Sequence, residues 1–135
     1  MEKAKGRILC VDDDEDACEM MNALLDLQGY EVIQAQNVAE GLRQGMTNNL
    51  DLILLDWGFQ DGTGIDLCRM LRSTGVPTPI LFYTGVSDGA DIKRAMRAGA
   101  QGFLIKPVDS VELFHSLSRF LGNPGINIER SAETS

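Results

Sequence analysis

Cysteine, histidine and long apolar segments are all scarce in this sequence of 135 residues. The three cysteines, Cys10, Cys18 and Cys68, are odd in number and lack any Cys-x-x-Cys spacing, which argues against a disulfide framework and a zinc site. No apolar run approaches the roughly 20 residues that a helix needs to cross a bilayer. The basic start from Met1 to Arg7 leads straight into a strand pattern, unlike a signal peptide. These absences favour a cytoplasmic protein without a membrane partner.

Basic residues are also in the minority, with 12 lysines and arginines against 20 aspartates and glutamates. The net charge of -8 argues against a direct, sequence-independent grip on nucleic-acid phosphates. An acidic protein is better suited to bind a cation or a basic partner surface. With 44% hydrophobic and 24% charged residues, the chain has the composition of one ordinary globular domain.

What the sequence does contain is a regular alternation of short apolar runs and helical patterns. Five runs are expected to be strands, at residues 7–11, 31–35, 52–55, 80–83 and 102–105. Each is followed by apolar residues at helical spacing, so five helices are expected as well. This alternation predicts an α/β fold in three layers, with a parallel sheet between helices and right-handed crossovers.

Acidic residues directly follow two of these strands. Asp12 and Asp13 follow the first strand, and Asp56 follows the central one. Because parallel strands end at the same edge of a sheet, these carboxylates should meet there, beside Thr84 and Lys106 from the last two strands. Two unit charges about 4 Å apart repel by about 4 kcal/mol at an effective dielectric of about 20, so the cluster should hold protons or bind a cation. Oxygen ligands without a usable cysteine or histidine favour Mg²⁺ over Zn²⁺.

A carboxylate in such a site can act as a covalent nucleophile towards phosphorus. The metal and the Lys106 ammonium would neutralise the phosphoryl oxygens, and the Thr84 hydroxyl would add a hydrogen bond. Asp56 is the candidate nucleophile because it ends the central strand with the other groups on either side. Taken singly, these residues also have plain explanations, since an acidic run such as Asp12–Asp16 often forms the solvated start of a helix.

In combination, four motifs resemble the receiver domains of two-component response regulators. They are ILCVDDD, DLILLD followed by a glycine-rich loop and GIDLC, the threonine that ends the fourth strand, and GAQGFLIKP. The resemblance covers roughly residues 7–121 and implies a doubly wound, flavodoxin-like sheet with the strand order 2-1-3-4-5. It also implies a phosphoprotein that is not an enzyme for an external substrate. Such a protein takes a phosphoryl group from a sensor histidine kinase or a histidine phosphotransfer protein in a phosphorelay.

The likeness carries over to individual residues around the nucleophile. It makes Asp56 the phosphoacceptor, and it makes Asp12, Asp13, Asp56 and the backbone carbonyl of Gly58 the ligands of Mg²⁺. The sequence departs from the family at Gln60, where proline is usual. This departure puts the stiffness of the loop after Asp56 in question more than its chemistry.

The resemblance also assigns a phosphate-binding pair and a switch. Thr84 would bind a phosphoryl oxygen, Lys106 would pair with the phosphate, and Phe103 would move inward when Thr84 shifts. The face made by the fourth helix, fifth strand and fifth helix would then repack and bind an output partner. The protein would be a monomer or a phosphorylation-dependent homodimer.

Two features next to this site have both a plain and a functional interpretation. Trp57, the single tryptophan, is expected to be a partly packed loop aromatic whose fluorescence reports the arrival of Mg²⁺ or phosphate. The fourth helix is basic on its expected outer side, which is either a solvated face or part of the docking surface. Its basic residues are Lys93, Arg94 and Arg97.

Other interpretations of the chain remain open at this point. Asp12 and Asp14 give the Asp-x-Asp pattern of Asp-nucleophile phosphatases of the dehalogenase type, although the following threonine and a cap segment are absent. A receiver-like binding module that is never phosphorylated is the second alternative. Residues 7–121 are expected to form the domain and residues 122–135 a loose tail or a severed linker. Because only this segment follows the last expected helix, the chain is expected to be either a stand-alone receiver or a piece of a longer protein.

Overall fold

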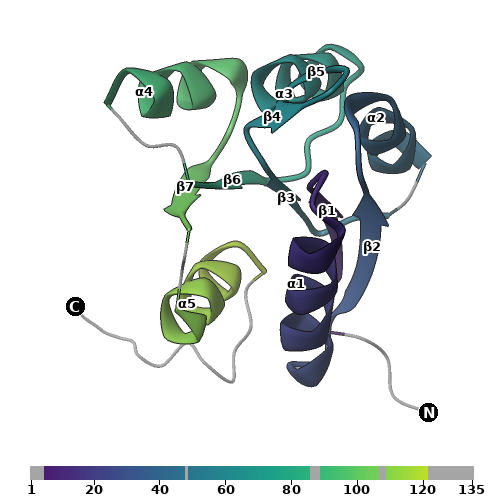
Figure 1. Cartoon of the computed structure of the whole chain (residues 1–135), viewed down its shortest axis with the longest axis vertical. Helices are drawn as coiled ribbons and strands as arrows, with labels where there is room; N and C mark the ends of the chain where they lie inside the picture. The colour runs from purple at the N-terminus through teal and green to yellow at the C-terminus, as the bar shows by residue number, and fades with distance from the viewer. Residues whose placement is uncertain (1–4, 48, 86–88, 107–108, 122–135) are drawn as a thin grey trace.

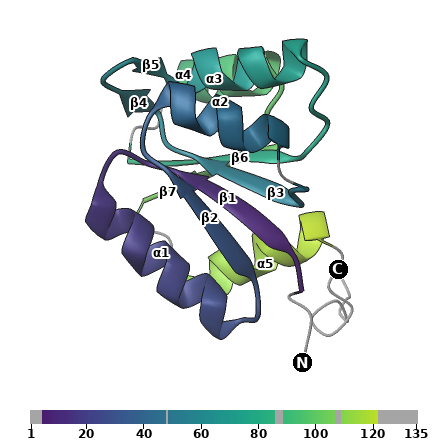
Figure 2. The same cartoon turned by 90° about the vertical axis from the view of Figure 1, so that its right-hand side faces the viewer.

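The computed structural model describes residues 5–47, 49–85, 89–106 and 109–121, and arranges them in three layers (Figures 1 and 2). The central sheet is parallel, and its strand order β2-β1-β3-β6-β7 confirms the predicted order 2-1-3-4-5. Its strands are β1 (Arg7–Val11), β2 (Glu31–Ala35), β3 (Leu52–Leu55), β6 (Ile80–Thr84) and β7 (Gly102–Ile105). The predicted tail, residues 122–135, lies outside the described residues.

Helices cover both faces of this sheet. In Figure 1, α1 and α5 lie on one side of the strands, and α2, α3 and α4 lie on the other. The helices are α1 (Glu15–Leu27), α2 (Val38–Thr47), α3 (Gly64–Ser73), α4 (Gly89–Ala98) and α5 (Ser110–Leu121). Among the described residues, none of the helices combines the length and the apolar character needed to cross a membrane.

The central strand β3 is apolar along its whole length because both of its faces are covered. Ile53 and Leu55 belong to the core cluster under α2, α3 and α4, whereas Leu52 and Leu54 belong to the cluster under α1 and α5. This is the alternation expected of a strand. All four side chains are at most 1% exposed, so β3 holds the residue that follows it, Asp56, in a fixed position.

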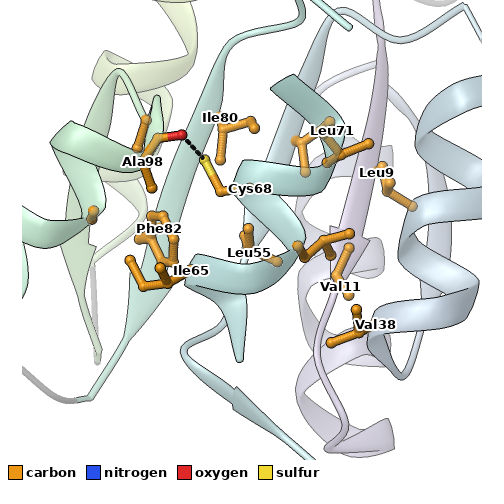
Figure 3. Packing of buried hydrophobic residues seen from close by; sticks show 14 of the residues in the cluster. Leu9, Val11, Val38, Leu55, Ile65, Cys68, Leu71, Ile80, Phe82 and Ala98 are labelled. Carbon is orange, nitrogen blue, oxygen red and sulfur yellow. Dashed lines mark hydrogen bonds between the residues drawn. The ribbon is translucent and has the colours of Figure 1, made fainter. Parts of the chain in front are cut away.

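The cluster under α2, α3 and α4 also joins these helices to one another (Figure 3). The Cys68 thiol of α3 donates a hydrogen bond of 3.4 Å to the carbonyl of Ala98 at the end of α4. Helix α2 approaches α3 closely because Gly41 and Gly45 face two leucines of α3. A Cβ atom at either glycine would lie 2.7 Å from a leucine methyl group, so larger residues would push the helices apart.

Helix α4 is more exposed than its apolar spacing predicts. Helical spacing in the sequence predicts that Ile92, Ala95 and Met96 face the sheet, but Ile92 and Met96 are 37% and 43% exposed. The buried residues of this helix are Ala95 and Ala98. The helix therefore packs through a narrow alanine stripe, which leaves the larger apolar residues beside the stripe at the surface. The prediction for Ile92 and Met96 was wrong for this reason.

Arg72, near the end of α3, connects two turns at the end of the sheet where β6 and β7 begin. Its guanidinium donates hydrogen bonds of 2.8–3.0 Å to the carbonyls of Val76, Thr78 and Gly99 and to the side-chain oxygen of Gln101. Because Arg72 is half-buried, these acceptors replace water as hydrogen-bond partners of its guanidinium group.

Replacing Arg72 with methionine is expected to lower the free energy of unfolding by about 2–4 kcal/mol, because the acceptor carbonyls lose their partner. Urea unfolding followed by circular dichroism measures the change. The matched control is Arg69→Met, an exposed arginine on the same helix, for which we expect a change below about 0.5 kcal/mol. Equal losses in the two variants would contradict this role of Arg72.

The segment after Asp56 differs from the expected loop. It forms an antiparallel hairpin of two short strands, β4 (Gly58–Phe59) and β5 (Gly62–Thr63). Figure 2 shows this hairpin beside the start of α2. The prediction of a glycine-rich loop was therefore wrong in part, because the glycines allow the chain to turn back on itself within six residues.

Candidate functional site

The carboxyl ends of β1 and β3 bring three acidic residues together, as the sequence predicts. One carboxylate oxygen from each of Asp12, Asp13 and Asp56 lies within 4.8 Å of the others. The sheet fixes the backbones of two of them, since Asp12 N donates to the carbonyl of Ala35 and Asp56 N to that of Val11, both at 3.0 Å. Asp12 is buried, Asp56 is half-buried and Asp13 is exposed, so the cluster is open to solvent on the side of Asp13.

Lys106, which follows β7, reaches into this cluster from the fifth strand, again as predicted. Its Nζ lies 2.9 Å from Asp12 Oδ2 and 3.6 Å from Asp56 Oδ2. The ammonium also lies 5.0 Å from the centre of the Tyr83 ring, a cation–π contact. This role of Tyr83 was not predicted from the sequence, although its place beside Thr84 at the end of an otherwise apolar strand was an available signal.

Thr84 lies on β6, which pairs with the central strand β3, and Phe103 lies on β7, which pairs with β6. Thr84 ends β6 and is 2% exposed, and its carbonyl accepts a hydrogen bond of 2.9 Å from Lys106 N. Phe103 pairs with Phe82 across the ladder between β6 and β7, and the two rings stack with centres 6.0 Å apart. The structure thus brings Asp12, Asp13, Asp56, Thr84 and Lys106 to one edge of the sheet, whereas Phe103 lies nearer the start of β7. The roles of Thr84 and Phe103 remain predictions.

Burial and crowding of charge shift the protonation of the cluster. Burial raises the pKa of Asp56 above its ordinary value, and the nearby Asp12 carboxylate adds to this effect. The Trp57 N–H, which donates to Asp56 Oδ1 at 2.7 Å, and Lys106 act in the opposite direction without cancelling it. Burial opposes the charge of Lys106, but its hydrogen bond to Asp12 and its attraction to Asp56 raise the pKa of Lys106 overall. Both shifts favour the protonated form of the group concerned, which makes the site less negative.

The raised pKa of Asp56 predicts how stability depends on pH. Above the folded-state pKa, the ionised carboxylate lowers the stability of the metal-free protein, and this loss is relieved as the pH falls towards the ordinary value of 3.8. We expect Asp56→Asn to raise the melting temperature at neutral pH by roughly 2–5 °C. The gain should vanish in acid and shrink in Mg²⁺. Thermal unfolding in EDTA measures it, and a gain that does not vary with pH would contradict the explanation.

The β4–β5 hairpin holds the chain directly after Asp56. Gly64 N donates to the carbonyl of Trp57 at 2.7 Å, and Gly58 stands opposite Thr63 in the ladder. In an antiparallel ladder this pattern makes Gly58 and Thr63 a pair without mutual hydrogen bonds. The hairpin therefore does not use the Gly58 carbonyl, which is compatible with its predicted role as a metal ligand.

Asp61, at the tip of the hairpin, fastens it to the start of α2. Its carboxylate accepts hydrogen bonds from the backbone N–H groups of Val38 at 2.9 Å and Ala39 at 3.1 Å. The bond from Val38, followed by that from Ala39, holds the pKa of Asp61 below its ordinary value. The hairpin and this anchor supply the stiffness that Gln60 puts in question. The role of Asp61 was not predicted from the sequence, although an Asp-Gly dipeptide is a common hairpin signal.

Trp57 lies between the acidic cluster and α4. Its ring centre is 5.5 Å from that of Phe82 and 6.2 Å from that of Phe103. The guanidinium carbon of Arg94, on α4, lies 5.9 Å from the centre of the Trp57 ring. Trp57 is partly packed, as expected, but the contact with Arg94 was not predicted.

Comparison with known proteins identifies the family to which this arrangement belongs. Residues 8–118 match the family described as "Response regulator receiver domain". The chain belongs to this family. The receiver domain is 34% identical over 107 residues to the transcriptional regulatory protein DltR of Streptococcus agalactiae serotype III (strain NEM316). That match covers 79% of the chain and 48% of DltR, so the chain spans about half the length of this relative.

Solved structures show the same fold as the receiver domain. A two-component response regulator from Clostridium difficile has a TM-score of 0.83 and 28% identity, over 88% of this chain and 98% of that chain. The BeF3-activated receiver domain of DrrB has a TM-score of 0.78 and 25% identity, over 87% of this chain and 98% of that chain. The agreement over nearly the whole of both structures favours the receiver interpretation over a phosphatase of the dehalogenase type.

Proposed function

We propose that the receiver domain accepts a phosphoryl group on Asp56 with the help of Mg²⁺. The observation that supports this most is the meeting of three carboxylates within 4.8 Å, with Lys106 Nζ 2.9 Å from Asp12 and 3.6 Å from Asp56. Asp12 is a poor nucleophile, because its side chain is 4% exposed and accepts hydrogen bonds from Lys106 and from Asp14 N. The Asp56 side chain is 17% exposed, so a donor can reach it while Lys106 remains nearby.

The residues present fit Mg²⁺. The carboxylates of Asp12, Asp13 and Asp56 together with the Gly58 carbonyl form an all-oxygen donor set, which this ion prefers. Three carboxylates and the Lys106 ammonium carry three negative charges and one positive charge, a net of -2 that a divalent cation neutralises. When bound, the ion would supply positive charge to the phosphoryl oxygens.

The proposed donor is a phosphohistidine of a sensor kinase or of a phosphotransfer protein. A carboxylate oxygen of Asp56 attacks phosphorus, the phosphorus–nitrogen bond breaks, and the imidazole leaves with the electron pair and takes up a proton. Lys106 neutralises charge on the phosphoryl oxygens, and the Thr84 hydroxyl donates a hydrogen bond to one of them. The domain assists its own modification and does not turn over an external substrate.

The proposed output surface is the face made by α4, β7 and α5. The shift of Thr84 towards the phosphoryl group and the inward movement of Phe103 would repack this face. Four large apolar side chains on it are at least 37% exposed, which suits a surface that binds a partner. They are Ile92, Met96, Ile105 and Val111.

A small phosphodonor tests this proposal without a kinase. Acetyl phosphate in Mg²⁺ is expected to add one phosphoryl group per chain, detected by intact-mass spectrometry and removed by hydroxylamine, and EDTA should prevent the labelling. Failure to label under these conditions would favour the binding module that is never phosphorylated. Steady release of inorganic phosphate from varied monoesters would instead favour a phosphatase.

A further inference from the structure

Trp57 connects the candidate phosphoryl site to α4 through contacts that the proposed function does not use. Its backbone N–H donates to Asp56 Oδ1 at 2.7 Å, so its position depends on the nucleophile. Its ring packs against Phe103 at 6.2 Å, so its position also depends on the proposed switch residue. Phosphorylation would change both of these neighbours at once.

Arg94, on α4, connects this helix to Trp57. Its guanidinium carbon lies 5.9 Å from the centre of the Trp57 ring, and its Nη1 lies 3.6 Å from Asp91 Oδ1, one turn earlier on the helix. The Arg94 side chain is 56% exposed, whereas α4 is fixed to the core by Ala95 and Ala98. The cation–π contact between Arg94 and Trp57 therefore lies at the surface and can break without unfolding of the helix.

We propose that the contact between Trp57 and Arg94 acts as a latch that holds α4 against the start of the segment after Asp56 in the unphosphorylated state, and that phosphorylation of Asp56 releases it. This inference rests on the proposed function of Asp56. Inward movement of Phe103 removes one of the rings against which Trp57 packs, and a phosphoryl group on Asp56 alters the oxygen that its N–H faces. Arg94 then loses its cation–π contact with the Trp57 ring. Phosphorylation thus affects α4 through this contact as well as through the shift of Thr84.

Thermodynamic linkage sets the size of the effect. An interaction that is present only in the unphosphorylated arrangement opposes the phosphorylated one, so its removal tightens the binding of a phosphoryl group or its analogue by the same factor. For a cation–π contact at an exposed position, that factor is about two- to five-fold.

The test uses BeF₃⁻, a tetrahedral analogue of the phosphoryl group, titrated calorimetrically in Mg²⁺ into the full chain. Arg94→Gln is expected to bind BeF₃⁻ about two- to five-fold more tightly than the wild type. The matched control Arg97→Gln removes the same charge from an exposed position of the same helix and should leave the affinity unchanged. In a Trp57→Leu background, Arg94→Gln should have no further effect, since its partner ring is gone.

The outcomes separate the latch from the proposed function. An Arg94→Gln variant that binds BeF₃⁻ no more tightly than Arg97→Gln, or that gains as much in the Trp57→Leu background, would overturn the latch alone. A wild-type protein that does not bind BeF₃⁻ in Mg²⁺ would overturn the proposed function and the latch with it. If Trp57→Leu fails to fold, the comparison between Arg94→Gln and Arg97→Gln still decides.

Discussion

Asp56→Asn is expected to abolish labelling by acetyl phosphate, with a loss in rate of at least about a thousand-fold. The neutral amide cannot attack phosphorus as the carboxylate does, yet it has nearly the same shape. Its oxygen can still accept the 2.7 Å hydrogen bond from Trp57 N, so the loop should keep its position. Intact-mass spectrometry after incubation in Mg²⁺ measures the loss directly.

Asp51→Asn is the matched control, because Asp51 precedes the same strand that Asp56 follows. Asp51 lies at the opposite edge of the sheet, where its Oδ2 accepts a hydrogen bond of 2.8 Å from Arg7 N. Asparagine can keep this bond, so Asp51→Asn should label at the wild-type rate. Labelling that persists in Asp56→Asn, on a residue identified by peptide mapping, would show that another side chain is the nucleophile.

Gly64→Ala is expected to lower the free energy of unfolding by about 2–4 kcal/mol and to slow labelling as well. A Cβ atom at Gly64, the first residue of α3, would collide with the backbone carbonyl oxygen of Asp56 and lie 2.8 Å from Phe82 Cε2. The carbonyl cannot rotate away as a flexible side chain can, so either α3 or the end of β3 has to move. Urea unfolding and the labelling rate together measure this displacement.

Gly89→Ala provides the comparison for Gly64→Ala. Gly89 is the first residue of α4, and a Cβ atom there would meet nothing within 4 Å. We expect this variant to be unchanged or more stable by up to about 1 kcal/mol, because alanine favours the helix and restricts the unfolded chain. If both variants unfold alike and label at the wild-type rate, the contact between α3 and Asp56 does not constrain the site.

The acidic cluster could be predicted from the sequence because its placement depends on local signals. A run of four apolar residues shows where β3 ends, and a parallel sheet brings the ends of its strands to one edge. Asp12, Asp56 and Lys106 come from segments far apart in the chain, yet each needs only the end of its own strand to be recognised. The same rule placed Thr84 beside them.

The contacts around this cluster could not be predicted, because they depend on how packed elements meet. The hydrogen bonds that Val38 N and Ala39 N donate to the Asp61 carboxylate cross 23 and 22 residues of sequence and require both a hairpin and the start of α2. Periodicity indicates that Arg94 lies on the outer side of α4, but not that it reaches Trp57. The exposure of Ile92 and Met96 likewise follows from the alanine stripe, which apolar spacing alone does not distinguish from a wider buried face.

The two ion pairs of Lys106 involve carboxylates that are also candidate ligands of Mg²⁺. Because its ammonium already bridges Asp12 and Asp56, at 2.9 Å and 3.6 Å, it acts as an internal counter-ion for two of the acids that a divalent ion would share. The amine and a bound ion would therefore compete for the same oxygens. Lys106 itself compensates part of the negative charge of the cluster, and a bound Mg²⁺ would leave Lys106 available for a phosphoryl oxygen.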